Sequence, residues 1–164
     1  MILPRSAISG SLLALLLVAA DQATKQWIIS SVMVPPRVIE ITGFFNLVLV
    51  WNRGISFGLF NSGAPIGVWI LSGLAAAIVA FLMVWLWRAE SRLATVSLGL
   101  IIGGAIGNVI DRLHYGAVMD FLDFYIGGYH WPAFNVADSA ITVGAVLFVS
   151  ESLFGASEKP KLEK

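Results

Sequence analysis

Two long runs of the sequence contain no charged residue, and they restrict the fold more than any other feature. They extend from Ile66 to Trp87 and from Leu93 to Ile110, with the charged turn 88–92 between them. A helix needs about 20 apolar residues to cross the hydrocarbon core of a bilayer. Backbone polar groups in lipid must hydrogen-bond within their own segment, so both runs predict membrane-spanning α-helices.

Two further segments complete the prediction of an integral membrane α-helical protein with four transmembrane helices. The first covers residues 6–29, where the polar "DQATKQ" interrupts the apolar pattern, and the last covers residues 136–154. Hydrophobic residues make up 58% of the chain and charged residues 12%, whereas a soluble domain carries about 25% charge. The length of 164 residues predicts a single domain over residues 1–164.

The first segment has a second interpretation. Arg5, the apolar "LLALLLVAA" and the small residues before Asp21 are also typical of a cleavable signal peptide. The apolar character returns after the polar patch as "WIISSVMV", which favours a helix that is retained.

The connections between the four spans predict the topology. Residues 30–65 and 111–135 form long connections, which four spans place on one membrane face, whereas the short turn and both termini share the other face. The turn side is more basic, so the positive-inside rule predicts cytoplasmic termini and outward-facing long connections. The turn side carries Arg5, Arg88, Arg92, Lys159, Lys161 and Lys164, and the other side carries Lys25, Arg37, Arg53 and Arg112.

The first long connection contains two short segments that are typical of β-strands. "VIEI" and "FFNLVLVW" are rich in β-branched and aromatic residues and are bounded by proline and glycine. They predict a small interfacial β-sheet within residues 36–60, and an irregular interfacial loop is the alternative. The charged end "EKPKLEK" predicts a disordered tail over residues 156–164.

Polar residues that are far apart in the sequence gather at the outward-facing ends of the predicted spans. Ionisable side chains at membrane depth are functional candidates, because their burial costs free energy. The residues concerned are Asp21, Lys25, Asn52, Asn108, Asp111, Arg112, Asp120, Asn135 and Asp138.

Structural roles explain several of these residues equally well. Asp21 and Lys25 are four positions apart, so they can pair on one helix face. Asn135 can cap the last helix, with Asp138 as an acid in its first turn.

The third span ends in features that also have structural explanations. Asp111 and Arg112 can be an end-of-helix pair whose side chains reach the interface. Gly99, Gly103 and Gly107 recur at every fourth position, and such small residues let helices pack closely. This packing predicts that the third helix approaches the fourth, with Asn108 and Arg112 near Asp138.

Several kinds of chemistry are disfavoured by the composition. The chain has no cysteine, which excludes disulfides, thiolate nucleophiles and cysteine metal sites. His114 and His130 lack metal-ligand spacing and are read as interfacial side chains. The net charge of zero gives no reason to expect nucleic acid as a partner.

Paired carboxylates are the chemistry that remains. Asp120 and Asp138 can converge just outside the membrane in the predicted topology. Two close carboxylates share one proton, which leaves one acid and one base to activate a water. Asp111 and Asp123 compete for the same role on the sequence pattern alone.

Five motifs in fixed order give a more specific indication. They are "DQATK" (21–25), "NRGISFG" (52–58), "GGAIGNVIDR" (103–112), "VMDF" (118–121) and "FNVAD" (134–138). Together they resemble the motifs of bacterial lipoprotein signal peptidase, or signal peptidase II, an aspartic peptidase of the inner membrane. The resemblance runs from the first span to the last. One departure is the bulky Ile55, where the family often has a small residue, and it bears on the shape of the pocket.

The resemblance implies an activity and a set of roles. The enzyme would cleave diacylglyceryl-modified prolipoproteins before the lipidated cysteine, with Asp120 and Asp138 as the catalytic pair. Substrate contact or support of the pair is implied for Asn52, Gly54, Asn108, Arg112, Asn135 and Ala137. A structural or positioning role is implied for Asp21, Lys25 and Asp111.

The resemblance also implies the surroundings of the enzyme. It would be a monomer among membrane lipids, with its active site at the periplasmic face, and it would need no metal or other cofactor. Cyclic peptide antibiotics such as globomycin would block it by occupying the aspartate pair. The alternatives are a small transporter or channel lined by the polar residues, and a non-catalytic scaffold that binds lipoprotein precursors.

Overall fold

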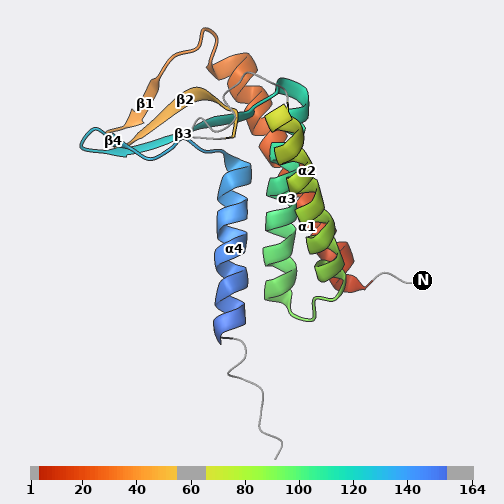
Figure 1. The fold of residues 1–164 in the computed structure, drawn as a ribbon. Coiled ribbons are helices and arrows are strands. Elements are labelled where there is room, and N and C mark those ends of the chain that lie inside the picture. The colour runs from red at the N-terminus through yellow and green to blue at the C-terminus, as the bar shows by residue number, and fades with distance from the viewer. Residues whose placement is uncertain (1–3, 55–65, 155–164) are drawn as a thin grey trace, which may run out of the picture.

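Four long helices form the body of the molecule, and the computed structural model describes residues 4–54 and 66–154 (Figure 1). The predicted tail and Ile55 lie outside these ranges. All four helices are long and apolar enough to cross a membrane, so the predicted transmembrane fold is confirmed. They are α1 (Arg5–Trp27), α2 (Ile66–Trp87), α3 (Arg92–Tyr115) and α4 (Val136–Phe154), and a π-helix, Ile28–Val32, continues α1.

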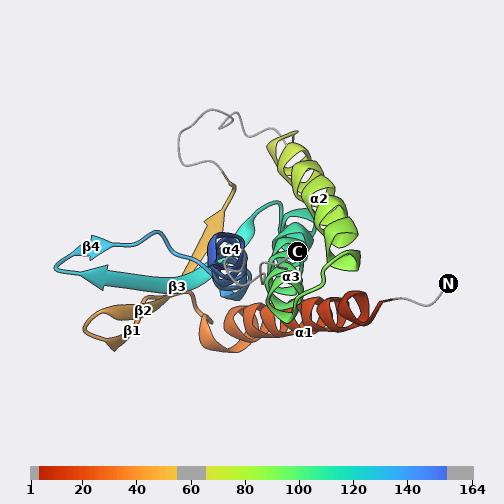
Figure 2. The ribbon, with the colours of Figure 1, turned by 90° about the horizontal axis from the view of Figure 1, so that it is seen from below.

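α3 lies at the centre of the bundle, with the other three helices around it (Figure 2). Glycines make this close packing possible, because a Cβ added at Gly99 would lie only 2.9 Å from the carbonyl oxygen of Gly10 in α1. A Cβ at Gly107 would meet the α1 side chain of Asp21 at 2.6 Å. The glycine stripe therefore packs chiefly on α1. The predicted approach of α3 to α4, with Asn108 near Asp138, is nevertheless present. Gly104, one position away from the stripe, packs on the backbone of Ala137 in α4.

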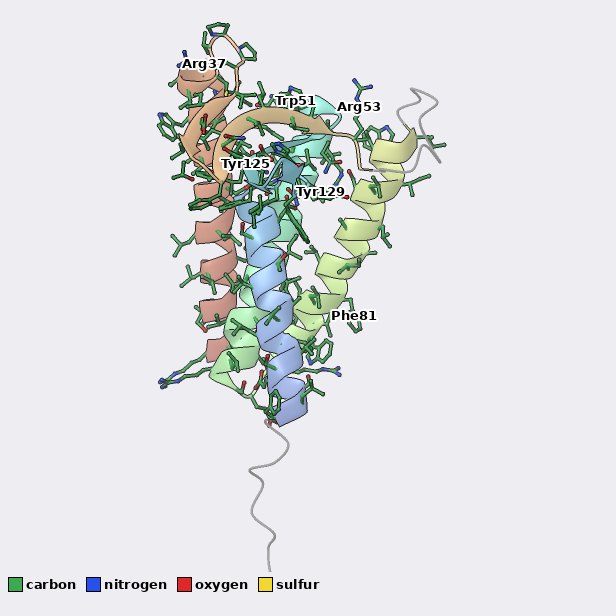
Figure 3. The ribbon with its side chains drawn as sticks, turned by 90° about the vertical axis from the view of Figure 1, so that its left-hand side faces the viewer. Arg37, Trp51, Arg53, Phe81, Tyr125 and Tyr129 are labelled. Carbon is green, nitrogen blue, oxygen red and sulfur yellow. The ribbon has the colours of Figure 1, made fainter. Side chains whose placement is uncertain are left out.

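The outer surfaces of the helices are apolar. Phe81 is 64% exposed and points away from the bundle (Figure 3). Leu86, Leu98 and Ile102 fill the space between the helices and are almost fully buried. This arrangement, with small and apolar residues inside and large apolar residues outside, is that of a protein whose solvent is lipid.

A small antiparallel sheet covers one end of the bundle and extends sideways from it (Figure 1). Its order is β1-β2-β3-β4, and the turn between α2 and α3 lies at the opposite end of the molecule. An apolar cluster of Ile28, Met33, Met119 and Phe121 includes residues of both the π-helix and the sheet. The strands are β1 (Ile39–Thr42), β2 (Phe45–Asn52), β3 (Val118–Ile126) and β4 (Tyr129–His130).

The sheet contains more of the chain than the sequence predicted. The two strands predicted in the first long connection are present as β1 and β2, and both predicted long connections do lie at the same end. β3 and β4 come from the second connection, in which no strand was predicted. β2 pairs with β3 in register Val50 to Asp120 and Asn52 to Val118. This pairing joins residues that are far apart in the sequence, so no local pattern reveals it.

α3 is longer than the predicted span, which ended at Ile110. It continues to Tyr115 and ends where Gly116 adopts a left-handed conformation with φ of 72°. Asp111 and Arg112 therefore lie within the helix, with Arg112 in its last turn. The helix continues through the charged positions because Asp111 is buried and bonded to protein groups instead of water.

Candidate active site

Asp120 is the third residue of β3 and is only 1% exposed. Asn52, at the end of the neighbouring strand β2, donates from Nδ2 to Asp120 Oδ2 over 3.0 Å. Asn135, which directly precedes α4, donates from Nδ2 to Asp120 Oδ1 over 2.8 Å. The sheet and the start of α4 thus each hold one oxygen of this carboxylate.

Asp138 lies in the first turn of α4 and forms a capping box with Asn135. The backbone N–H of Asp138 donates to Asn135 Oδ1 over 2.9 Å, and the backbone N–H of Asn135 donates to Asp138 Oδ2 over 3.2 Å. Each side chain satisfies a backbone donor that a helix start otherwise leaves free. The predicted capping role is therefore confirmed, and the same contacts fix the Asp138 carboxylate at the positive end of the helix dipole.

Two asparagines join the two carboxylates. Asn108 of α3 donates from Nδ2 to Asp138 Oδ1 over 2.8 Å. Asn135, which already holds Asp120, donates to Asn108 Oδ1 over 3.2 Å. Asp138 is half-buried whereas Asp120 is buried, so the pair is accessible on the Asp138 side.

A buried ion network lies behind this pair. Lys25 Nζ is 2.8 Å from Asp21 Oδ2 and 2.8 Å from Asp111 Oδ2, and no side chain of the three is more than 3% exposed. Lys25 also donates to Asn108 Oδ1 over 3.4 Å. The predicted pairing of Asp21 with Lys25 is present, but it is one part of a larger network that joins α1 to α3.

The two acids of this network bind backbone groups beside the central carboxylates. Asp21 Oδ1 accepts the N–H of Ala137 over 3.0 Å, and Ala137 precedes Asp138. Asp111 Oδ2 accepts the N–H of Met119 over 3.1 Å, and Met119 precedes Asp120. The network therefore holds the backbone at both sites.

Gln22 is a further member of the network that sequence reasoning missed. Its Nε2 lies 3.1 Å from Asp21 Oδ2, 2.9 Å from Asp111 Oδ1 and 3.3 Å from the carbonyl oxygen of Gly107. The signal was present in the sequence, since Gln22 is an uncharged polar residue inside the "DQATK" interruption of an apolar helix.

The surroundings of Asp120 favour its protonated form. Burial raises the pKa of Asp120 to about 6, and the negative charge of Asp138 adds to this rise. Hydrogen bonds from Asn52 and Asn135 and the charge of Lys25 act in the opposite direction. A carboxyl group with this pKa can hold a proton at mildly acidic pH, where an ordinary aspartate cannot.

Gly54 fixes the orientation of Asn52. Its N–H donates to Asn52 Oδ1 over 2.8 Å, which leaves the Asn52 Nδ2 directed at Asp120. Gly54 has φ of 95°, and the side chain of Leu71 occupies the space that a Cβ would need. Both observations explain why a glycine suits this position.

Arg112 lies beside the pair with unused donors. Its Nη1 is 3.5 Å from the carbonyl oxygen of Asn108, and its Nη2 is 3.9 Å from the position of a Cβ on Gly54. The Nε of this half-buried arginine is buried without a hydrogen-bond partner among the described residues.

The other two candidate aspartates have different partners. Asp111 belongs to the ion network, and Asp123 contacts His130 and Asn46 on the sheet, each over 2.9 Å. Hydrogen bonds from these two residues lower the pKa of Asp123 against the opposing effect of burial.

His114 stacks edge-on against Tyr115 at the end of α3. Across residues 4–54 and 66–154, no group of three or more His, Cys, Asp or Glu residues is arranged to hold a metal ion.

Comparison with a model of the signal peptidase (SPase) II family gives a match over residues 13–154. A lipoprotein signal peptidase of Rhodopseudomonas palustris (strain TIE-1) is 47% identical over 152 residues, which cover 90% of this chain and 93% of the relative. A lipoprotein signal peptidase of Cupriavidus taiwanensis is 49% identical over 141 residues, which cover 85% of this chain and 80% of the relative.

Solved structures are similar over almost the whole chain. A bacterial membrane enzyme determined by the in meso method at 2.3 Å resolution matches with a TM-score of 0.76 and 31% identity, covering 95% of this chain and 94% of that one. The sequence match and the structural match thus cover the same helices and sheet.

Proposed function

This chain belongs to the signal peptidase II family, and on that premise we propose that it is an aspartic endopeptidase that removes signal peptides from prolipoproteins. The substrate is a precursor whose cysteine already carries a diacylglyceryl group, and the peptide bond before that cysteine is cleaved. The observation that carries the proposal is the connection of Asp120 to Asp138 through Asn135 and Asn108.

In the first step, one water attacks the carbonyl carbon of the scissile bond. Asp138, ionised and held by two N–H donors, takes a proton from this water. Asp120, whose raised pKa of about 6 lets it hold a proton at mildly acidic pH, donates that proton to the carbonyl oxygen. The product of the step is a tetrahedral diol, with the proton now on Asp138 and the negative charge on Asp120.

In the second step, the diol collapses and the C–N bond breaks. Asp138 returns its proton to the leaving nitrogen of the cysteine, which becomes the new amino terminus. One hydroxyl of the diol gives its proton to Asp120 as the carboxylic acid of the signal peptide forms. Both carboxyl groups are thereby restored to their starting states, so the cycle consumes only water.

Substrate binding is assigned to Arg112 and Asn52. The free donors of Arg112 are suited to carbonyl oxygens of an extended peptide. Asn52 is exposed at the end of β2, where a peptide could add contacts beside the pair. The apolar outer surfaces of the helices let the lipid chains and the signal helix of the substrate stay in the bilayer.

We assign the active site to the outer face of the bacterial inner membrane, with both termini in the cytoplasm. The charge bias of the sequence supports this orientation. At the sheet end, Lys25 is buried and Arg112 is half-buried within the site. Arg37 and Arg53 lie at the same end and are exposed (Figure 3). Arg5, Arg88 and Arg92 lie at the other end. The sequence predicts that Lys159, Lys161 and Lys164 lie on the same side as these three.

The decisive experiment compares two precursors with the purified protein in lipid bilayers. One precursor carries the diacylglyceryl group on its cysteine and the other is unmodified. Cleavage of the modified precursor alone, before the cysteine, is the expected result. Flux of small solutes without proteolysis would support a transporter, and binding of the precursor without cleavage would support a scaffold.

A further inference from the structure

A cavity lies at the end of the bundle opposite the sheet. Its volume is about 440 Å³, and it is formed where α1 and α3 begin. Figure 2, a view from this end, shows the turn between α2 and α3 beside α1. Arg5 and Ser6 contribute from the first turn of α1, and Arg92 and Thr95 contribute from the first turn of α3. None of these residues takes part in the proposed chemistry.

Two arginines without an ion-pair partner among the described residues and two helix starts face the cavity. Arg5 and Arg92 are both exposed, and neither forms a salt bridge with any residue that the structure describes. Glu90 also lines the cavity, and Glu151 accepts a hydrogen bond from Ser91 of the lining, so two carboxylates lie near the two arginines without forming a salt bridge to them. The amide groups at the starts of two parallel helices add partial positive charge. Neither first turn contains an acidic residue that would offset this charge. The start of α1 also has no side-chain cap, which leaves its first amide groups available to an acceptor.

The depth of the cavity identifies the kind of anion. Both α1 and α3 are long and apolar enough to span the bilayer, so their first turns lie at the level of the lipid headgroups. Leu13 and Val96 form the apolar part of the lining. Val96 is itself 40% exposed, so the cavity opens onto the lipid-facing surface of the bundle.

We propose that this cavity binds the phosphate headgroup of an anionic phospholipid, with Arg5 and Arg92 as the phosphate ligands. Arginine suits this role because its planar group can give two parallel hydrogen bonds to a phosphate. The acyl chains leave the cavity past Val96 into the bilayer. In the proposed orientation, the lipid belongs to the inner leaflet, on the side of the membrane away from the peptidase site.

The test uses lipids that differ only in headgroup. Delipidated full-length protein is mixed with micelles containing phosphatidylglycerol and phosphatidylcholine of identical acyl chains, and bound lipid is counted by native mass spectrometry. We expect phosphatidylglycerol to be preferred on the order of tenfold, because each arginine near a lipid surface adds substantially to the attraction for anionic lipid. The variant R5Q/R92Q should bind both lipids about equally, whereas E90Q should increase the preference.

Arg88 provides a matched control, because it is an exposed arginine at the same end that does not line the cavity. R88Q should keep the preference of the unmodified protein. An equal loss in R88Q and R5Q/R92Q, or no preference in the unmodified protein, would overturn the proposal. Displacement of the lipid by millimolar inorganic phosphate would show an ion site and would also overturn it. These measurements need no cleavage assay, so they are independent of the proposed peptidase activity.

Discussion

The backbone N–H of Ala137 donates to Asp21 Oδ1 over 3.0 Å, although the two residues are 116 positions apart. Through this bond, the first helix holds the residue that precedes Asp138. Asp111 holds the residue that precedes Asp120 in the same way. Lys25 forms a salt bridge with each of these two acids. A single ammonium group thus supports the backbone next to both members of the proposed catalytic pair.

Replacement of Lys25 tests this support. Lys25→Met leaves two buried carboxylates without their cation, which typically costs about 3–5 kcal/mol of unfolding free energy. We expect a marked fall in the midpoint of thermal unfolding in micelles, followed by circular dichroism. Arg37→Met removes an exposed cation at the same end of the molecule and should leave the midpoint unchanged. Equal midpoints for the two variants would contradict a supporting role for the network.

Neutralisation of either central aspartate should abolish cleavage. Asp120→Asn and Asp138→Asn each keep the size of the side chain but remove the proton transfer, so we expect the rate to fall by at least about 10²-fold. The readout is cleavage of a lipidated precursor, together with folding measured by circular dichroism. Asp123→Asn is the control, because Asp123 lies on the same strand but bonds to His130. Normal cleavage by either of the first two variants would exclude the paired-aspartate mechanism.

The pH dependence should reveal the proton on Asp120. Asp120 is protonated below about pH 6 and ionised above it, and the proposed mechanism needs the proton. We therefore expect kcat/KM to fall as the pH rises through this value. Asn52→Ala removes a hydrogen bond that lowers the pKa of Asp120, so the falling limb should move to higher pH.

Asn46→Ala is the matched control for this shift. Asn46 lies on the same strand as Asn52, but its side chain bonds to Asp123. The limb of Asn46→Ala should coincide with that of the unmodified enzyme. A limb that stays in place in Asn52→Ala would show that another group controls the profile.

Gly104 should be intolerant of a methyl group. A Cβ there would collide with the backbone of Ala137 and lie 2.8 Å from Ile141 Cγ1. Gly104→Ala should therefore push α4 away from α3 and cost about 1–3 kcal/mol of stability. Activity should fall as well, since Ala137 adjoins Asp138. Gly73 has no atom within 4 Å of a Cβ position, so Gly73→Ala should retain full activity and at least the original stability.

The transmembrane part of the fold was predictable because each membrane-spanning helix corresponds to one apolar run of the sequence. α2 and α4 have the predicted bounds, 66–87 and 136–154. The predicted end of α3, at Ile110, was wrong because the charged residues after it were taken as a sign of the membrane boundary. Asp111 instead stays inside, where Lys25 neutralises it. The glycine at 116 was the more reliable signal for the end of this helix.

The polar site was predictable as a group but not in its geometry. Topology alone indicated that Asn52, Asn108, Asp120 and Asp138 lie at one end. The strand that carries Asp120 was missed because its aspartates resemble a polar loop, and its pairing partner β2 lies in the other long connection. The backbone bonds to Asp21 and Asp111 depend on distances between helices, which sequence spacing does not contain. The roles assigned to these residues remain predictions.

The position of Asp138 in the first turn of α4 has a consequence for biogenesis. In the proposed orientation, a chain with three inserted helices already carries Asp120 on the far side of the bilayer, while Asp138, its proposed partner, is still in the translocon. The capping contacts that orient Asp138 form only when the fourth span enters the membrane. Under the proposed mechanism, the chain therefore cannot cleave a substrate until its fourth span is inserted, and a nascent chain stalled before that point is inactive.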